Sequence, residues 1–178
     1  MSFVGKLLVA SPMMGDPNFV GGVVLVCAHD PEGALGVLLN RPTELAVADH
    51  LPEWGDRVVP PSVVFLGGPV QVEVAVGIAT AGAALADWTA VVGDTGMIDL
   101  SSVASGTTVG RARVFAGYAG WGAGQLEAEV GAGDWLVVPA HPDDPFDADP
   151  GGLRRRVLAR QVDSKRFYAD YPADPRLN

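Results

Sequence analysis

The stretch GYAGWGAGQLE, residues 117–127, is the segment on which the fold prediction rests. It follows an apolar segment containing Val114 and Phe115 and runs into the helix-like sequence QLEAEV, so it predicts a strand, a turn and then a helix. Glycine permits positive φ angles and the close approach of a second backbone, at a cost in conformational entropy. Four glycines within eight residues therefore indicate a backbone shape that other residues would not permit.

Seven short apolar segments predict strands, because each is rich in Val, Leu or Ile and is bounded by Gly, Pro, Asp or Asn. They are residues 4–10, 21–27, 34–39, 63–66, 74–79, 113–117 and 135–138. Most of these segments are apolar almost throughout, which predicts that many strands are covered on both faces. Residues 81–108 lack a clear pattern and are expected to form a turn-rich meander.

Three short helices are also predicted. Thr43 is expected to cap the first, over residues 44–51, and the second runs from about residue 124 to residue 130. The third has the clearest start, with Asp149 as N-cap and Pro150 at the first helical position. Its apolar face is expected to carry Leu153, Val157, Leu158 and Val162, with Arg154, Arg155 and Arg160 outside. These elements predict a single α+β domain over residues 1–178.

Composition and charge narrow the class of protein. Hydrophobic residues make up 48% of the 178-residue chain and charged residues 19%, which is typical of a packed domain. No apolar run is long enough to span a bilayer, and the N-terminal apolar stretch is too short for a signal peptide. The single cysteine allows no internal disulfide, as in a reducing cytosol. We therefore expect a soluble, cytoplasmic protein without a membrane partner.

The net charge of −9 is unevenly distributed along the chain. Residues 1–150 carry 5 basic and 18 acidic side chains, whereas residues 151–178 carry 7 basic and 3 acidic ones. The acidic body argues against direct DNA binding, because phosphates bind to a concentrated positive surface. The basic end keeps an RNA contact open as an alternative to a solvated helix face. Its residues are Arg154, Arg155, Arg156 and Arg160.

Cys27 and His29 are candidate reactive side chains. Residues two apart on a strand point to the same side, and an imidazolium beside a thiol lowers the pKa of the thiol. The alternative, which we favour, is a buried cysteine followed by a histidine that begins a turn. The three histidines of the chain lack metal-ligand spacing, so neither a metal site nor a cofactor is predicted.

A ligand-binding cleft is predicted where three segments meet. Arg41, at a strand exit, could present its guanidinium to a carboxylate or phosphate, although a structural salt bridge is slightly favoured. The glycine-rich stretch does not match a phosphate loop, because Glu127 stands where a third glycine would be and no Lys-Ser or Lys-Thr pair follows. The candidate ligand contacts are Arg41, Gly67, Gly68, Tyr118, Trp121 and Gln125.

Four collinear segments resemble the YqgE/AlgH family of small bacterial proteins. They are LLVASPMMGDPNF (7–19), VCAHDPEGALGVLLNRP (26–42), VFLGGPV (64–70) and GYAGWGAGQLEAEV with GDWLVVPA (117–140). The resemblance is strongest over residues 1–146 and weaker over the basic C-terminal helix and tail, residues 150–178. It implies an α+β fold with a strongly bent, mixed or antiparallel sheet that approaches a barrel, and with a few helices packed outside.

The resemblance implies no established activity and no catalytic residues. One member carries a regulatory label in the control of exopolysaccharide synthesis, from which the family is described as transcriptional regulators, but this chain has no helix-turn-helix signature. We expect a non-catalytic binding or regulatory protein that acts through a protein partner or a small anion. The alternatives are a thiol-dependent enzyme or redox sensor that uses Cys27 with His29, and an RNA-associated protein that uses its basic C-terminal helix.

Overall fold

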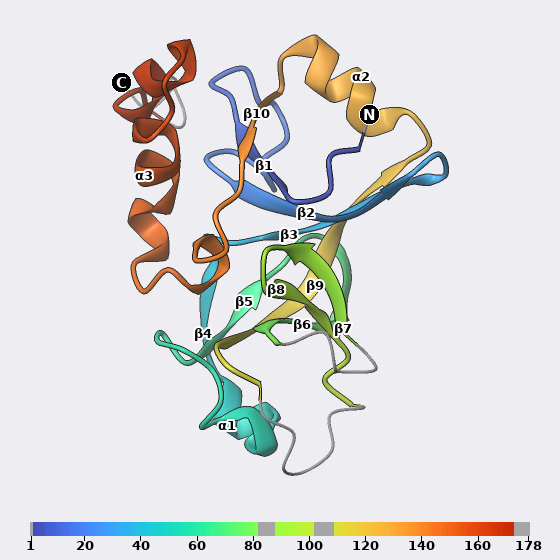
Figure 1. The fold of residues 1–178 in the computed structure, drawn as a ribbon, viewed down its shortest axis with the longest axis vertical. Coiled ribbons are helices and arrows are strands. Elements are labelled where there is room, and N and C mark those ends of the chain that lie inside the picture. The colour runs from blue at the N-terminus through green and yellow to red at the C-terminus, as the bar shows by residue number, and fades with distance from the viewer. Residues whose placement is uncertain (1, 82–87, 102–108, 173–178) are drawn as a thin grey trace.

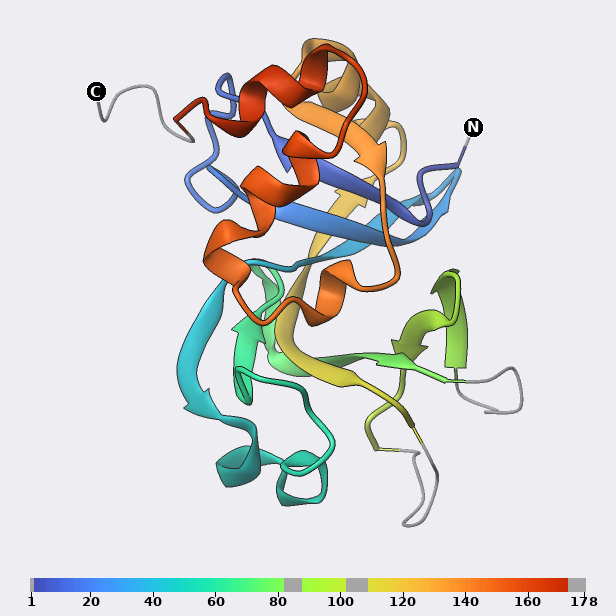
Figure 2. The same ribbon diagram turned by 60° about the vertical axis from the view of Figure 1, so that its left-hand side comes forward.

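The computed structural model of the chain describes residues 2–81, 88–101 and 109–172. Within these residues ten strands form one sheet in the order β10-β1-β2-β3-β9-β6-β8-β7, with β5 beside β9 and β4 beside β5. The pairings between these strands are antiparallel except that of β5 with β9. The sheet curls into a half-barrel with a few helices outside it (Figures 1 and 2), which confirms the predicted fold class.

The strands are β1 (Lys6–Ala10), β2 (Val23–Asp30), β3 (Gly33–Leu38), β4 (Pro42–Ala46), β5 (Val63–Leu66), β6 (Val70–Thr80), β7 (Trp88–Val92), β8 (Thr95–Ile98), β9 (Ala112–Gly122) and β10 (Trp135–Pro139). The α-helices are α1 (Val47–His50), α2 (Gln125–Ala132) and α3 (Leu153–Ala159). Short 3-10 helices are η1 (Pro52–Trp54), η2 (Asp144–Phe146), η3 (Pro150–Gly152) and η4 (Ser164–Ala169).

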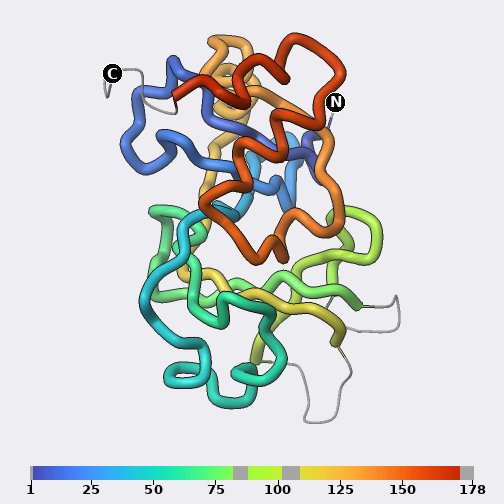
Figure 3. The backbone as a smooth tube through the Cα atoms, turned by 90° about the vertical axis from the view of Figure 1, so that its left-hand side faces the viewer, coloured from blue at the N-terminus to red at the C-terminus, as the bar shows by residue number. Residues whose placement is uncertain are grey.

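Strands β1 and β2 are covered on both faces, as their continuous apolar sequences predict. On one face Leu7 and Leu25 belong to a core that also contains Leu153 of α3. On the other face Leu8 and Val24 pack in a second core with α2. The backbone tube in Figure 3 follows α3 and the C-terminal segment along the outside of these strands.

The third core lies beneath α1 and η1, at the end of the molecule opposite α2 in Figure 1. Val47 and Trp54 are buried there against Val64 of β5 and Val114 of β9. The indole Nε1 of Trp54 donates a hydrogen bond to the carbonyl of Leu100, at 3.2 Å. Long strand β9 connects this core to the other two, because it extends beside β5, β6 and β3 in turn.

Several local predictions need correction. Thr43 lies in strand β4 and does not cap a helix; its hydroxyl donates to the carbonyl of Val64 at 2.6 Å, and α1 is a single turn. Within the predicted meander the chain forms the antiparallel pair β7 and β8, while residues 82–87 and 102–108 lie outside the described residues. The glycine-rich stretch is mostly strand, since β9 continues to Gly122; Gly117 bends it with a φ of +68°.

The start of the C-terminal helical segment is confirmed. The Asp149 carboxylate accepts a hydrogen bond from the backbone N–H of Gly152, and Pro150 occupies the first turn, which is 3-10 helix. The predicted faces are partly wrong, because Arg154 is buried and Val162 is 99% exposed. The length of the helix explains the error at Val162, since α3 ends at Ala159 and Val162 lies beyond it.

A buried arginine on β9 joins segments that are distant in the sequence. Arg113 is 1% exposed and its guanidinium lies 4.4 Å from the centre of the Phe65 ring. Its Nη1 and Nη2 donate to the carbonyls of Asp147 and Pro60, at 2.9 and 2.7 Å. Burial lowers the pKa of Arg113 to about 10, so the side chain is protonated at neutral pH.

We predict that Arg113→Met lowers the free energy of unfolding by about 3 kcal/mol, because the carbonyls of Pro60 and Asp147 lose a buried, charged hydrogen-bond donor. Chemical denaturation followed by circular dichroism measures this change. The matched control is Arg155→Met, which removes an ion pair with Asp170 at the surface. The side chain of Arg155 is 73% exposed and that of Asp170 is 78% exposed. That variant should change stability by less than about 1 kcal/mol. Equal losses in the two variants would contradict the role assigned to Arg113.

Candidate functional site

Cys27 is a buried thiol in the core of the half-barrel. The residue is 3% exposed and packs in the same core as Leu25 and Val37. Its Sγ donates to the carbonyl of Leu25 at 3.5 Å. Burial raises the pKa of Cys27 from 9.0 to about 12, so the nucleophilic thiolate is scarce at neutral pH.

A β-bulge separates Cys27 from His29. Strand β2 pairs with β3 through Val26 and then Ala28, which leaves Cys27 as the extra residue of the bulge. The bulge interrupts the two-residue alternation on which the predicted Cys27–His29 pair depended. Cys27 and Ala28 line one cleft whereas His29 lines another, so the structure does not bring the thiol and the imidazole together.

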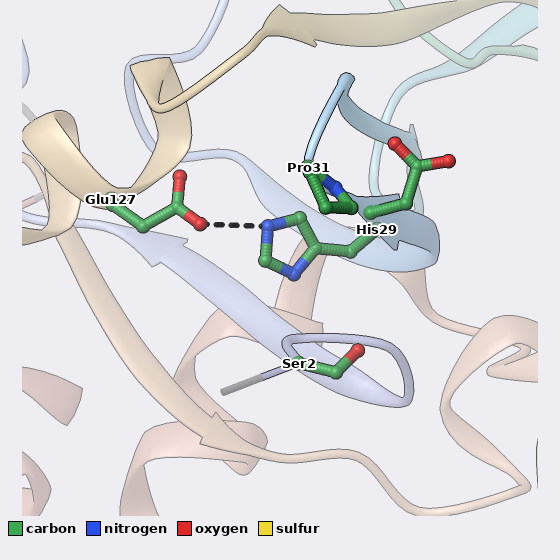
Figure 4. Close-up of a pocket in the computed structure, with 5 residues that line it drawn as sticks. Ser2, His29, Pro31 and Glu127 are labelled. Atoms are coloured by element: carbon green, nitrogen blue, oxygen red, sulfur yellow. Dashed lines mark hydrogen bonds and ion pairs between the residues drawn. The ribbon is translucent and has the colours of Figure 1, made fainter.

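The His29 cleft is small, with a volume of about 300 Å³, and is lined by Ser2, His29, Asp30, Pro31 and Glu127 (Figure 4). His29 Nε2 lies 2.8 Å from Glu127 Oε1, and the backbone N–H of Phe3 donates to His29 Nδ1 at 3.1 Å. Because Nδ1 accepts a hydrogen bond, a neutral His29 carries its proton on Nε2 and donates it to Glu127.

The His29–Glu127 contact joins β2 to the first turn of α2. A hydrogen bond with its own backbone N–H and the hydrogen bond with His29 both lower the pKa of Glu127. Both nitrogens of His29 are thus engaged in holding the N-terminal segment and α2. The sequence carries no signal for this pair, because the two residues are 98 positions apart.

Arg41 is half-buried and holds the loop that precedes β2. Its Nη2 donates to the carbonyl of Val20 at 2.5 Å and its Nη1 to the carbonyl of Asn40 at 3.4 Å. Burial lowers its pKa. Among the residues that the structure describes, no carboxylate forms an ion pair with Arg41, so backbone carbonyls take the place of the expected salt bridge.

Gly67 and Gly68 pack directly against β9. The N–H of Gly67 donates to the carbonyl of Ala116 at 2.8 Å, and a Cβ atom on Gly68 would collide with the backbone of Tyr118. Since the N–H of Leu66 also donates to the carbonyl of Arg41, the structure brings Arg41, this turn and Tyr118 together. The close neighbour of the two glycines is the adjacent strand.

Trp121 and Gln125 belong to a separate group centred on the Glu129 carboxylate. The indole N–H groups of Trp121 and Trp135 both donate to Glu129 Oε2 at 2.8 Å, and Gln125 Nε2 donates to Oε1 at 2.9 Å. Trp121 is buried and stacks against Phe19. The six predicted ligand contacts therefore divide into two groups, in which most of the polar atoms already have partners within the protein.

All four arginines of the predicted basic patch have partners within the chain. Arg154 is buried and donates to the carbonyls of Tyr168 and Tyr171. Arg156 contacts Asp147 and Asp149, Arg160 makes two 2.6 Å bonds to Asp144, and Arg155 pairs with Asp170. The acidic segment at residues 143–149 thus neutralises much of the basic helix beside it.

Two further hollows were not predicted. A cleft of about 600 Å³ within the curl of the sheet is lined by Cys27, Ala28, Ala75, Val76, Thr89, Met97, Ile98 and Asp99. A groove of about 250 Å³ is lined by Leu45, His50, Leu51, Val64, Val72, Glu73, Val74, Ala75, Val114, Phe115 and Ala116. We call these the curl cleft and the β4–β6 groove. Both are mainly apolar, and Ala75 lines both.

A sequence model of the family described as AlgH-like matches residues 7–165, so the chain belongs to this family. UPF0301 proteins of Streptomyces avermitilis and Thermobifida fusca are 46% and 44% identical to it, over 99% and 100% of this chain and 96% of each relative. The expected family is confirmed. No described helix is long and apolar enough to cross a membrane.

Two solved structures share the fold. A protein of Corynebacterium diphtheriae superposes with a TM-score of 0.81 at 29% identity, covering 94% of this chain and 91% of its own. The AlgH protein of Pseudomonas aeruginosa gives a TM-score of 0.72 at 31% identity, with 96% and 95% covered. The family is of uncharacterised function.

We predict that Cys27 in the folded protein reacts slowly with a thiol reagent at mildly alkaline pH, and rapidly once denaturant exposes it. The raised pKa also makes stability depend on pH. Between 9.0 and about 12 the unfolded chain loses the thiol proton first, so the free energy of unfolding falls as pH rises through this window. Cys27→Ala should remove that part of the pH dependence. Equal labelling rates for folded and unfolded protein would contradict the prediction.

Proposed function

We propose that this member of the AlgH-like family is a non-catalytic binding protein that holds an extended segment of a protein partner in the β4–β6 groove. The observation that carries the proposal is the exposure of large apolar side chains there. Leu45, Val72 and Val74 all line the groove and are 50%, 52% and 41% exposed. Exposed apolar patches of this kind are typical of interaction surfaces.

The groove occupies the part of a sheet face that α1 and η1 leave open. Val47 and Trp54 cover the neighbouring part of that face and are buried. Burying apolar surface contributes about 25 cal/mol per Å², offset by the entropic cost of association. A partner that fills the groove would therefore extend the existing third core.

Strand β6 also offers an edge for main-chain hydrogen bonds. Its pairing with β8 covers Gly77–Thr80 alone, so in the described part of the chain the first half of β6 has no strand neighbour on that side. An extended peptide can add to such an edge, with alternate side chains entering adjacent pockets. The groove and the edge together favour an extended partner over a helical one.

Charge indicates the composition of the partner. Glu73 lines the groove, and exposed Glu44 and Asp49 precede the groove residues Leu45 and His50 in the sequence. Carboxylates around an apolar surface favour a segment that carries Lys or Arg. A second copy of this chain would bring the same acidic face against itself, which like-charge repulsion disfavours.

The alternatives draw less support from the geometry. The thiol-dependent enzyme needs Cys27 and His29 together, and RNA binding needs arginines that are free to contact phosphates.

The single cysteine favours a reducing compartment, so we place the partner in the cytoplasm.

The test compares two fluorescently labelled peptides in which Leu alternates with Lys or with Glu, and measures binding by fluorescence anisotropy. The Lys peptide should bind more tightly, with an affinity that falls as salt is added. Leu45→Gln and Val74→Gln should each weaken its binding about tenfold, since each places an uncharged polar group in the apolar groove.

Val162→Gln is the matched control, because Val162 is 99% exposed on the C-terminal segment and does not line the groove. It should bind the Lys peptide as the unaltered protein does. The proposal fails if the Glu peptide binds equally well, or if folded groove variants retain full affinity.

A further inference from the structure

We infer that the curl cleft is a second binding site, which takes a small, mainly apolar molecule that is neutral or positively charged. The inference does not rest on the partner proposed for the β4–β6 groove, although Ala75 lines both hollows. Its volume of about 600 Å³ lies within the range of small-molecule sites, roughly 300–1,000 Å³.

The cleft exists because the curled sheet does not close into a barrel. Its walls come from β2, β6, β7 and β8, which are neighbours in space although β2 is separated from the other three in the strand order. β7 is the last strand of the order and lies against β2 without a described pairing, so the curl brings the two strands together at the cleft. A molecule in the cleft therefore contacts β2 and β7 at once.

The bulge in β2 shapes one wall. Because Cys27 is the extra residue, it and Ala28 both line the cleft, although they are consecutive. Ala28 and Ala75 have small side chains, which leave space between facing strands. Bulges commonly lie beside binding sites, where they redirect side chains.

The lining sets the chemistry of the ligand. Val76, Met97 and Ile98 provide apolar surface, and methionine adapts its shape to irregular ligands. The protonated thiol of Cys27 adds to this apolar wall, since burial raises its pKa. An apolar molecule of matching size would therefore lose little hydrogen bonding when it leaves water.

The polar groups of the lining select against anions. Thr89 supplies a hydroxyl, and Asp99 supplies a carboxylate whose Oδ1 accepts hydrogen bonds from Ser101. None of the eight lining residues that the structure describes is Lys, Arg or His. A bound anion would thus meet negative charge without a basic partner, whereas a neutral or cationic group would not.

The test uses three probes that share one aromatic body, namely naphthylmethylamine, naphthylmethanol and naphthoate. The protein carries isotope-labelled methionine methyl groups and is titrated by NMR. Met97 lines the cleft, whereas Met13 and Met14 do not and serve as internal references. The amine and the alcohol should shift the Met97 methyl signal in a saturable manner, and naphthoate at the same concentration should not.

A pair of variants tests the location. Ala28→Phe places a ring in the cleft and should weaken binding of the amine by about tenfold or more. Ala90→Phe adds the same ring at an exposed position of β7 that does not line the cleft, and should leave the affinity unchanged.

Three results would overturn the inference: no Met97 shift with any probe, an equal shift with naphthoate, or equal affinities in the folded Phe variants. The first two are read from the unaltered protein, so they do not depend on how well a variant folds.

Discussion

The buried guanidinium of Arg113 is the interaction on which the arrangement of the other elements depends. It lies on the strand that joins the two ends of the molecule, stacks on Phe65 and holds the carbonyls of Pro60 and Asp147. A charge buried this deeply persists only where its donors are largely satisfied, so the segments that supply those carbonyls are fixed in place. Asp147 in turn binds Arg156, which extends the network to α3. The acidic segment at residues 143–149 and the basic C-terminal helix are thus two parts of one charge network.

Much of the fold could be predicted from local patterns. Apolar runs bounded by turn residues identify most strands, and the Asp149–Pro150 pair identifies the start of a helical segment, because these signals act over a few residues. The errors arise where contacts between residues distant in the sequence determine the local structure. Thr43 lies in a strand because β5 is available to pair with β4. Arg154 is inside because the C-terminal segment folds back over it and accepts its hydrogen bonds.

The candidate site was harder to predict than the fold. Arginine, glycine and tryptophan residues were predicted as ligand contacts because their chemistry is distinctive. In the structure these particular residues pack against neighbouring strands and hold loops. Both hollows are lined mainly by apolar side chains, most of which carry no chemical signal in a single sequence. Cys27 shows the geometric reason most clearly. Its relation to His29 depends on a bulge, and a bulge is defined by pairing with β3 rather than by the residues of β2 alone.

Ala75 gives the two hollows a shared wall. It lies where the pairing of β6 with β9 shifts register, and it lines the groove as well as the cleft. An occupant of either hollow acts on the same short piece of chain, so the two binding equilibria are thermodynamically linked wherever that piece adopts a different position for each. Linkage of this kind is reciprocal: a factor by which the small molecule changes the affinity for the peptide is also the factor by which the peptide changes the affinity for the small molecule. Strand β6 therefore does more than support the sheet: through Ala75 it contacts both hollows, so it is placed to couple them.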